Sequence, residues 1–333
     1  MNRATINKNE AYYDEINIAR GIALLCVLIG HAFPDAQEGM TRIEAYYIWK
    51  SMYSFHMGAF FFLSGFVSGE KLCGERVRLL SEIIKKFKRL LVPYFFYSFL
   101  VLFLKQVMEN VANNQFELSD AWKIFLGVSP HGGMWYLWSL VVVALVCLVI
   151  NQFSRDQRTF LSIGVICIVL FYIVPNTIFE NVFKYFIYYS IGICFQQNYA
   201  IIKQRMKART ILIVSSVVAL VFVLCVYLRG EYVISCLCGI WILLLLSIII
   251  SMRKDSRTYK VLDELGIYSY DIYLISYFVQ VGIQVIFYKI LSMPYWLLVV
   301  ITFFCGAIIP YFLCKYVIRR IPILNKLLLG NWH

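Results

Sequence analysis

The chain has 333 residues, of which 61% are hydrophobic and only 15% are charged. In soluble globular domains about a quarter of the residues are charged, so this composition excludes an ordinary soluble domain. The apolar residues gather in long runs, which predicts an all-α polytopic membrane protein.

Ten apolar segments approach the length of about 20 residues that a helix needs to cross a bilayer. In chain order they lie at about 16–33, 51–69, 90–110, 133–151, 159–175, 178–197, 210–228, 231–252, 265–288 and 294–316. Asp14 and Glu15 flank the first segment, which we predict to be a retained helix and not a cleaved signal peptide. No repeat or linker divides the series, so we expect a single transmembrane domain at 1–333 with about ten helices.

Basic residues concentrate in alternate loops. The loop at 70–89 carries seven lysines and arginines and the loop at 253–260 carries four, whereas the intervening loops carry few. By the positive-inside rule, this predicts a protein of the plasma membrane with both termini in the cytoplasm. The net charge of +12 is then a topology signal that favours contact with anionic membrane lipids and predicts no nucleic-acid partner.

The cysteine pattern predicts neither a disulfide framework nor a metal site. Most of the ten cysteines lie inside apolar segments, where cysteine is a small apolar side chain. The close pair Cys236 and Cys238 has no second pair and no nearby histidine, so we expect no metal.

The first segment carries Arg20 near one end and His31 near the other. Their separation of eleven residues is about three helical turns, which places them on nearly the same face and roughly 16 Å apart along the axis. Ionisable groups inside a membrane are costly and mark functional sites. The alternative is that Arg20 extends to the head groups and that His31 lies at the outer interface.

The second segment reads "SFHMGAFFFLSGFVSG" and places His56 at a depth similar to that of His31. Gly58 and Gly65 indicate close helix packing. For His56, a hydrogen bond at the membrane interface and a functional role are both open.

The third segment begins with "KKFKRLLVPYFF", at its predicted cytoplasmic entrance. Lys86 and Arg89 are three residues apart and are expected to share a helix face. Both residue types bind phosphate, so the pair predicts a site for a phosphate-bearing ligand. An ordinary positive-inside flank would explain the charges alone, but not their combination with Arg20 at the same depth.

Together these stretches resemble the acyltransferase 3 family of bacterial membrane proteins. Arg20 and His31 match the spacing of the family's first motif, and "FHMGAFFFLSGF" matches its second, with Gly58 where proline is frequent. Lys86-x-x-Arg89 resembles the family's Arg-x-x-Arg, "GMWYLWSL" resembles its W-[FY]-L motif, and "SYDIYLISY" resembles a late stretch that often ends in histidine. Here Ser276 stands at the position of that histidine, so we assign no acid–base role there.

The resemblance implies an enzyme that transfers an acyl group, usually acetyl, from cytoplasmic acyl-CoA to a hydroxyl of a carbohydrate acceptor. The phosphates of coenzyme A would bind Lys86 and Arg89, and its arm would pass Arg20. His31 would then accept the proton of the attacking hydroxyl, with His56 positioning His31 or the acceptor. Asp35 is a weaker candidate to orient His31, because Pro34 interrupts the helix between them.

A transporter or flippase that moves a glycan or small solute without chemistry is the main alternative, because polar groups would also line such a pathway. The basic residues at the predicted cytoplasmic entrance, beside Arg20, favour a binding site for a nucleotide over a path for a neutral sugar. A membrane sensor is a third possibility, for which no partner-binding domain is recognisable.

The alternation of basic loops predicts which single cysteines an impermeant thiol reagent can reach in a cysteine-free background. Met40→Cys and Glu117→Cys should be labelled in intact cells, whereas Leu80→Cys and Arg257→Cys should react only after permeabilisation. Labelling of Leu80→Cys in intact cells would place the Lys86 and Arg89 segment outside and contradict the acyl-CoA site.

Overall fold

The computed structural model describes residues 13–36, 39–107, 117–175, 177–205, 208–228 and 232–332. Every regular element within these ranges is helical, which confirms the all-α prediction for the described part of the chain. The termini at 1–12 and 333, whose cytoplasmic placement was predicted, and the end of the third segment at 108–110 lie outside the described residues.

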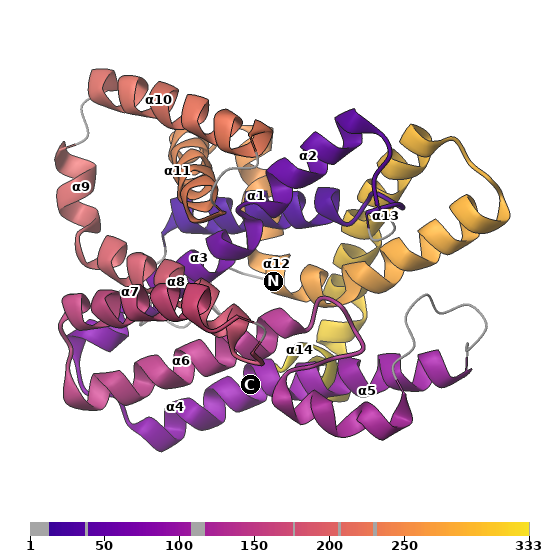
Figure 1. The fold of residues 1–333 in the computed structure, drawn as a ribbon, viewed down its shortest axis with the longest axis horizontal. Helices are drawn as coiled ribbons and strands as arrows, with labels where there is room; N and C mark the ends of the chain where they lie inside the picture. The colour runs from indigo at the N-terminus through magenta and orange to yellow at the C-terminus, as the bar shows by residue number, and fades with distance from the viewer. Residues whose placement is uncertain are drawn as a thin grey trace.

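Fourteen α-helices and four shorter helical segments make up the described fold (Figure 1). The α-helices are α1 (Asp14–Gly30), α2 (Ile43–Tyr53), α3 (His56–Gly74), α4 (Leu79–Lys86), α5 (Val92–Val107), α6 (Trp135–Phe153), α7 (Gln157–Ile173), α8 (Glu180–Gln197), α9 (Tyr199–Arg205), α10 (Ala208–Tyr227), α11 (Tyr232–Ser251), α12 (Arg257–Gln284), α13 (Tyr295–Tyr316) and α14 (Pro322–Leu329). The shorter segments are the π-helices η2 (Phe87–Leu91) and η4 (Val285–Ile290) and the 3₁₀ helices η3 (Leu118–Leu126) and η5 (Ile318–Arg320).

Six helices within the described ranges are long and apolar enough to cross a membrane, so the predicted count of about ten is not confirmed. The other four predicted segments lie on α1, α3, α7 and α8, which are shorter or more polar. Helices α1, α3 and α8 pack inside the bundle, where other helices surround their buried polar residues Asn17, His56 and Ser190.

Helix α10 shows the opposite arrangement and lies at the edge of the bundle in Figure 1, against α11 and α2. It exposes large aliphatic side chains, among them Leu212 at 70% and Leu220 at 60%. Aliphatic surface of this extent is incompatible with water but suits the hydrocarbon of a bilayer. The protein is therefore a membrane protein.

The second predicted segment is not one continuous helix, because the chain breaks at Ser54 and Phe55 between α2 and α3. The Ser54 hydroxyl donates a hydrogen bond to the carbonyl of Ser51, and the backbone of Phe55 leaves the helical region with φ −140°. The Phe55 ring lies against Gly239 of α11. His56 is consequently the first residue of α3, and not one and a half turns inside a longer helix.

Close contact between the backbones of α3 and α8 fixes the position of α3. A Cβ atom added to Gly65 would lie 2.0 Å from the carbonyl oxygen of Tyr189, and one added to Gly192 would lie 2.1 Å from that of Phe62. Small residues that allow two helices to approach in this way are typical of membrane proteins. The packing role predicted for Gly65 is confirmed.

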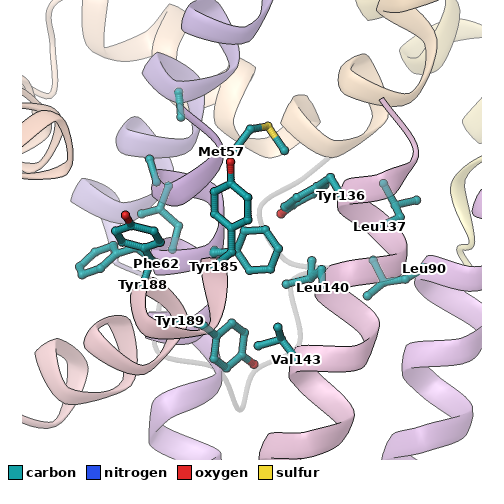
Figure 2. Close-up of a cluster of buried hydrophobic side chains, with 14 of the residues drawn as sticks. Met57, Phe62, Leu90, Tyr136, Leu137, Leu140, Val143, Tyr185, Tyr188 and Tyr189 are labelled. Atoms are coloured by element: carbon teal, nitrogen blue, oxygen red, sulfur yellow. The ribbon is translucent and has the colours of Figure 1, made fainter. Parts of the chain in front are cut away.

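Aromatic side chains fill the space around this contact. Figure 2 shows Tyr185, Tyr188 and Tyr189 of α8 beside Phe62 of α3, with Tyr136 projecting from α6. The ring of Tyr185 also stacks on Phe61, with their centroids 4.9 Å apart. Offset rings add directional attraction to apolar burial, so this core holds α3, α6 and α8 in one arrangement.

We expect Gly65→Ala to destabilise the protein, because the added methyl group collides with the backbone of α8. Forcing a carbon into a packed interior costs typically about 1–3 kcal/mol. The measurement is the midpoint of thermal unfolding in detergent. Gly74→Ala, at the open end of the same helix with no atom within 4 Å of the added carbon, is the matched control. Equal midpoints for the two variants would contradict the close contact.

Candidate active site

His31 directly follows the last residue of α1, and α12 binds the end of that helix. The side-chain amide of Gln280 donates to the carbonyl of Leu28 at 2.8 Å, and that of Gln284 donates to the carbonyl of His31 at 2.9 Å. The last carbonyls of a helix have no partner within the helix, so these amides satisfy groups that would otherwise be unbonded. Tyr53 lies beside the imidazole, with its hydroxyl oxygen 3.2 Å from Nδ1 of His31.

His56 lies on the other side of Tyr53. The ring centroid of Tyr53 is 4.8 Å from that of His56 and 5.7 Å from that of His31. Nδ1 of His56 is 2.7 Å from the carbonyl oxygen of Met52. A carbonyl can only accept, so Nδ1 carries the hydrogen and Nε2 of the neutral ring carries the lone pair. The structure thus brings together the two histidines that the sequence predicted as catalytic.

A third histidine, His131, belongs to the same group and was missed by the sequence analysis. It lies in the segment before α6, and its ring centroid is 4.3 Å from that of Tyr277, which is 6.2 Å from that of His31. His31 is also within electrostatic range of both His56 and His131. We call His31, Tyr53, His56, His131 and Tyr277 the histidine cluster. The sequence contained one signal of the cluster, because the whole chain has only four histidines and three of them lie in it.

Arg20 lies further along α1, outside the histidine cluster. It is partly buried and within electrostatic range of the hydroxyl of Tyr136 on α6. The ring of Tyr136 contacts that of Tyr273 on α12, with centroids 5.6 Å apart. Arg20 therefore lies near α6, at a position where α6 contacts α12 through aromatic rings.

Arg89 contacts α12 and the end of the described chain. Its guanidinium lies 4.1 Å from the ring centroid of Tyr270, and Nη1 donates to the carbonyl of Leu329 at 2.7 Å and to the side chain of Asn331. Nη2 is 4.0 Å from a carboxylate oxygen of Asp271. A planar fork of donors suits this set of acceptors, which orders the segment after α14 around the arginine.

Asp271 is a fully buried carboxylate within an apolar helix, and its main partner is Arg319. Nη2 and Nε of Arg319 donate to one carboxylate oxygen at 2.6 and 2.7 Å. A buried charge must be paired, so the two arginines neutralise this carboxylate from both sides. This ion pair joins α12 to η5 and was not predicted from the sequence.

Lys86 and Arg89 were expected to share a helix face, but their side chains lie near different elements. Arg89 faces α12 and the end of α14, whereas Lys86 is within electrostatic range of Cys147 on α6. The π-helix η2 begins directly after Lys86, and its wider turn changes the angle between the two side chains. Their predicted role in binding acyl-CoA stays a prediction.

Two residues singled out in the sequence have structural partners outside the histidine cluster. Asp35 accepts a hydrogen bond from the Tyr295 hydroxyl at 2.7 Å, and Arg42 lies 4.6 Å above the same ring. Tyr53, and not Asp35, is therefore the hydrogen-bond partner of the His31 ring. The hydroxyl of Ser276 bonds to the carbonyl of Tyr273 within its own helix.

All ten cysteines are free thiols. Among the residues that the structure describes, no group of three or more histidine, cysteine or acidic side chains is arranged to hold a metal ion. The histidine cluster itself presents imidazole and phenol groups, which can accept and donate protons.

The fold and the site together define a helical membrane protein with a cluster of histidines suited to proton transfer. The chain belongs to the acyltransferase 3 family, because that family's model, described as an acyltransferase domain, matches residues 13–314. This confirms the resemblance inferred from the motifs and makes the protein a transferase of that family.

The chain is also similar to Nodulation protein NolL of Mesorhizobium japonicum, at 24% identity over 201 residues. The match covers 58% of this chain and 50% of the relative, so the chain spans about half the length of that curated protein. No solved structure matches the chain.

Proposed function

We propose that the protein is an O-acyltransferase that moves an acetyl group from acetyl-CoA, bound on the cytoplasmic side, to a hydroxyl of a carbohydrate at the membrane. The observation that carries this proposal is the arrangement along α1. One helix holds Arg20 in the interior and ends at His31, where two further histidines meet from other elements. The anionic acyl donor and the histidine that accepts the proton can therefore lie along the same helix.

The donor site lies, in this proposal, between the basic residues at the start of the third segment and Arg20. Lys86 and Arg89 would hold the phosphates of coenzyme A, and Arg20 would lie beside its arm. Tyr136 supports this continuity, because its ring contacts Tyr273, which lies one turn along α12 from Tyr270, the residue whose ring Arg89 covers. Arg89 would exchange its bonds to Leu329 and Asn331 for phosphate oxygens, which are stronger acceptors.

The acceptor site lies at the histidine cluster. His56 is only 2% exposed, whereas His31 is partly exposed, so His31 is the histidine that an incoming hydroxyl can meet first. The contact between Nδ1 of His31 and the Tyr53 hydroxyl allows either group to donate. The proposal requires the tautomer in which Nδ1–H donates to the Tyr53 oxygen and Nε2 carries the lone pair of a general base. Nε2 of His56 can accept a second hydroxyl hydrogen of a sugar and so orient the acceptor.

The proposed reaction conserves protons within the site. The acceptor hydroxyl gives its proton to Nε2 of His31 while its oxygen attacks the thioester carbonyl carbon. The carbon–sulfur bond of the resulting tetrahedral species then breaks. Coenzyme A leaves as a thiolate, takes the proton from His31 and restores the neutral imidazole, while the acetyl ester remains on the carbohydrate.

His31→Ala should abolish acetyl transfer while leaving acetyl-CoA binding nearly intact, because His31 is roughly 16 Å along the axis from Arg20. Loss of a general base costs about 10²–10⁴ in rate. His56→Ala should cost less, since a positioning group leaves residual rate. The assay is transfer of labelled acetyl from acetyl-CoA to glycan in inverted membrane vesicles of the expressing host, normalised to protein level.

Full transfer by His31→Ala would contradict this mechanism and would favour a transporter that moves a glycan without chemistry. Equal and complete loss in both variants would contradict the separate roles given to the two histidines and would indicate a coupled catalytic unit. Both conclusions require that the variants insert into the membrane and unfold at the same temperature as the wild type.

Arg20→Ala and Arg89→Ala should each weaken binding of acetyl-CoA, measured by titration of the purified protein. A hydrogen bond to a charged group contributes about 1.5–3 kcal/mol, which corresponds to roughly a 10- to 100-fold change in Kd. Lys86→Arg should bind at least as tightly as the wild type, because it keeps the charge and adds a bidentate fork.

Arg320→Ala is the matched control for charge, since Arg320 is an exposed arginine that contacts Tyr316 and not Arg89. Its removal should leave the Kd for acetyl-CoA within about twofold, which is the scatter expected when no direct contact is lost. If affinity for acetyl-CoA is unchanged after removal of both Arg20 and Arg89, these arginines serve only membrane topology and contact with lipids.

A further inference from the structure

His131 is held in a fixed orientation by the backbone around it. The backbone N–H of Gly133 donates to Nδ1 of the imidazole at 3.0 Å, and the backbone N–H of His131 donates to the hydroxyl of Ser129 at 3.1 Å. Tyr273 donates to the carbonyl of Gly133, which ties the same turn to α12. The ring packs against Tyr277 and Phe278, with centroids 4.3 and 5.3 Å away.

These bonds determine which nitrogen of His131 carries the hydrogen. A backbone amide can only donate, so Nδ1 accepts from Gly133 and the hydrogen of the neutral ring is on Nε2. This is the opposite arrangement to that of His56, whose Nδ1 donates to a carbonyl and whose Nε2 accepts. The histidine cluster therefore contains an oriented acceptor on His56 and an oriented donor on His131.

The Nε2–H of His131 has no hydrogen-bond partner among the residues that the structure describes. The residue is only 2% exposed, so its donor is buried as well as unpaired. Buried donors are nearly always bonded, and an exception calls for an explanation such as a catalytic role. The position of this one, beside Tyr277 and within electrostatic range of His31, supplies that explanation.

We propose that His131 is a catalytic residue whose Nε2–H donates a hydrogen bond to the thioester carbonyl oxygen as that oxygen becomes negatively charged. The assignment rests on the proposed acyl transfer. When the acceptor oxygen bonds to the carbonyl carbon, the carbonyl electron pair moves onto oxygen, where the Nε2–H of His131 stabilises it. When the pair returns, the carbon–sulfur bond breaks, and His131 has neither gained nor lost a proton.

A fixed donor suits this role better than a mobile one, because no reorganisation is needed while the charge develops. His131 meets this condition through Gly133, Ser129 and the two aromatic rings that enclose it. His31 and His56 are less suited, since the proposed reaction uses both as acceptors. The three histidines thus divide into two acceptors and one donor.

The test compares His131→Gln with His131→Leu, because the amide nitrogen of glutamine replaces Nε2 as a donor and leucine fills the space without one. His131→Leu should lower kcat for acetyl transfer by about 10²–10³, the usual effect of removing one such donor. His131→Gln should retain most of the rate. Both should bind acetyl-CoA as the wild type does, in the vesicle and titration assays described for His31.

Thr302→Val is the matched control, since Thr302 also carries a buried hydroxyl with no hydrogen-bond partner among the described residues, on α13. Thr302→Val removes a buried polar group without changing side-chain shape, and its kcat should stay within about twofold of wild type because no reacting atom loses a contact.

If His131→Leu does not show wild-type thermal unfolding, His131→Asn replaces it. The shorter asparagine amide mimics Nδ1 and does not reach the position of Nε2.

Equal kcat values for the donor-bearing and donor-lacking variants would overturn the assignment, as would a loss confined to KM for the acceptor. Absence of transfer by the wild type would overturn the proposed function and this assignment together. Transfer by the wild type with an undiminished kcat in His131→Leu would overturn the assignment alone.

Discussion

Helix α1 carries polar groups that cannot face hydrocarbon, and the arrangement of the bundle follows from that constraint. Helices α3, α11 and α12 enclose α1, and the apolar helices such as α10 take the outer positions. Asn17 of α1 donates to the carboxylate and the carbonyl of Asp263, and Gly21 and Gly266 bring α1 and α12 into backbone contact. An enclosed α1 can keep Arg20 and His31 at two depths without exposing either to lipid.

The two ends of the proposed reaction path are stabilised in different ways. The histidine cluster depends on neutral hydrogen bonds and ring contacts, with the glutamines of α12 capping α1. The basic end depends on charge, since Asp271 is neutralised by Arg319 and approached by Arg89. Removing one partner of a buried ion pair such as Asp271–Arg319 typically costs about 3–5 kcal/mol. Arg89 lies 4.0 Å from the other carboxylate oxygen and is bonded to the carbonyl of Leu329. The proposed donor site is therefore coupled to the packing of η5 and of the segment after α14.

The sequence predicted the helical class, the shared helix of Arg20 and His31, and the proximity of His31 and His56. The first two features follow from hydrophobic length and helical period, which are local properties. The third followed from the similar depth of the two histidines on consecutive segments. The break at Ser54 and Phe55 lies inside one apolar run and is stabilised by Phe55 packing on α11, so no local pattern reports it. His131 and the Asp271–Arg319 pair depend on contacts between distant segments, which a single sequence does not reveal. The count of about ten spans is not confirmed, because α1, α3, α7 and α8 are shorter or more polar than a helix that length and composition alone identify as a span.

The break between α2 and α3 has an electrostatic consequence for the histidine cluster. It makes His56 the first residue of α3, while His31 is the residue that caps the end of α1. The carboxyl ends of α1 and α2 and the amino end of α3 therefore meet around Tyr53. A carboxyl end favours positive charge and an amino end favours negative charge, by typically about 0.3–1 kcal/mol each. In the proposed reaction, the carboxyl end of α1 would stabilise the imidazolium on His31, and the carboxyl end of α2 already holds the ring of His56 through the Met52 carbonyl. A continuous second helix would have used that carbonyl within its own backbone and left His56 without this orientation.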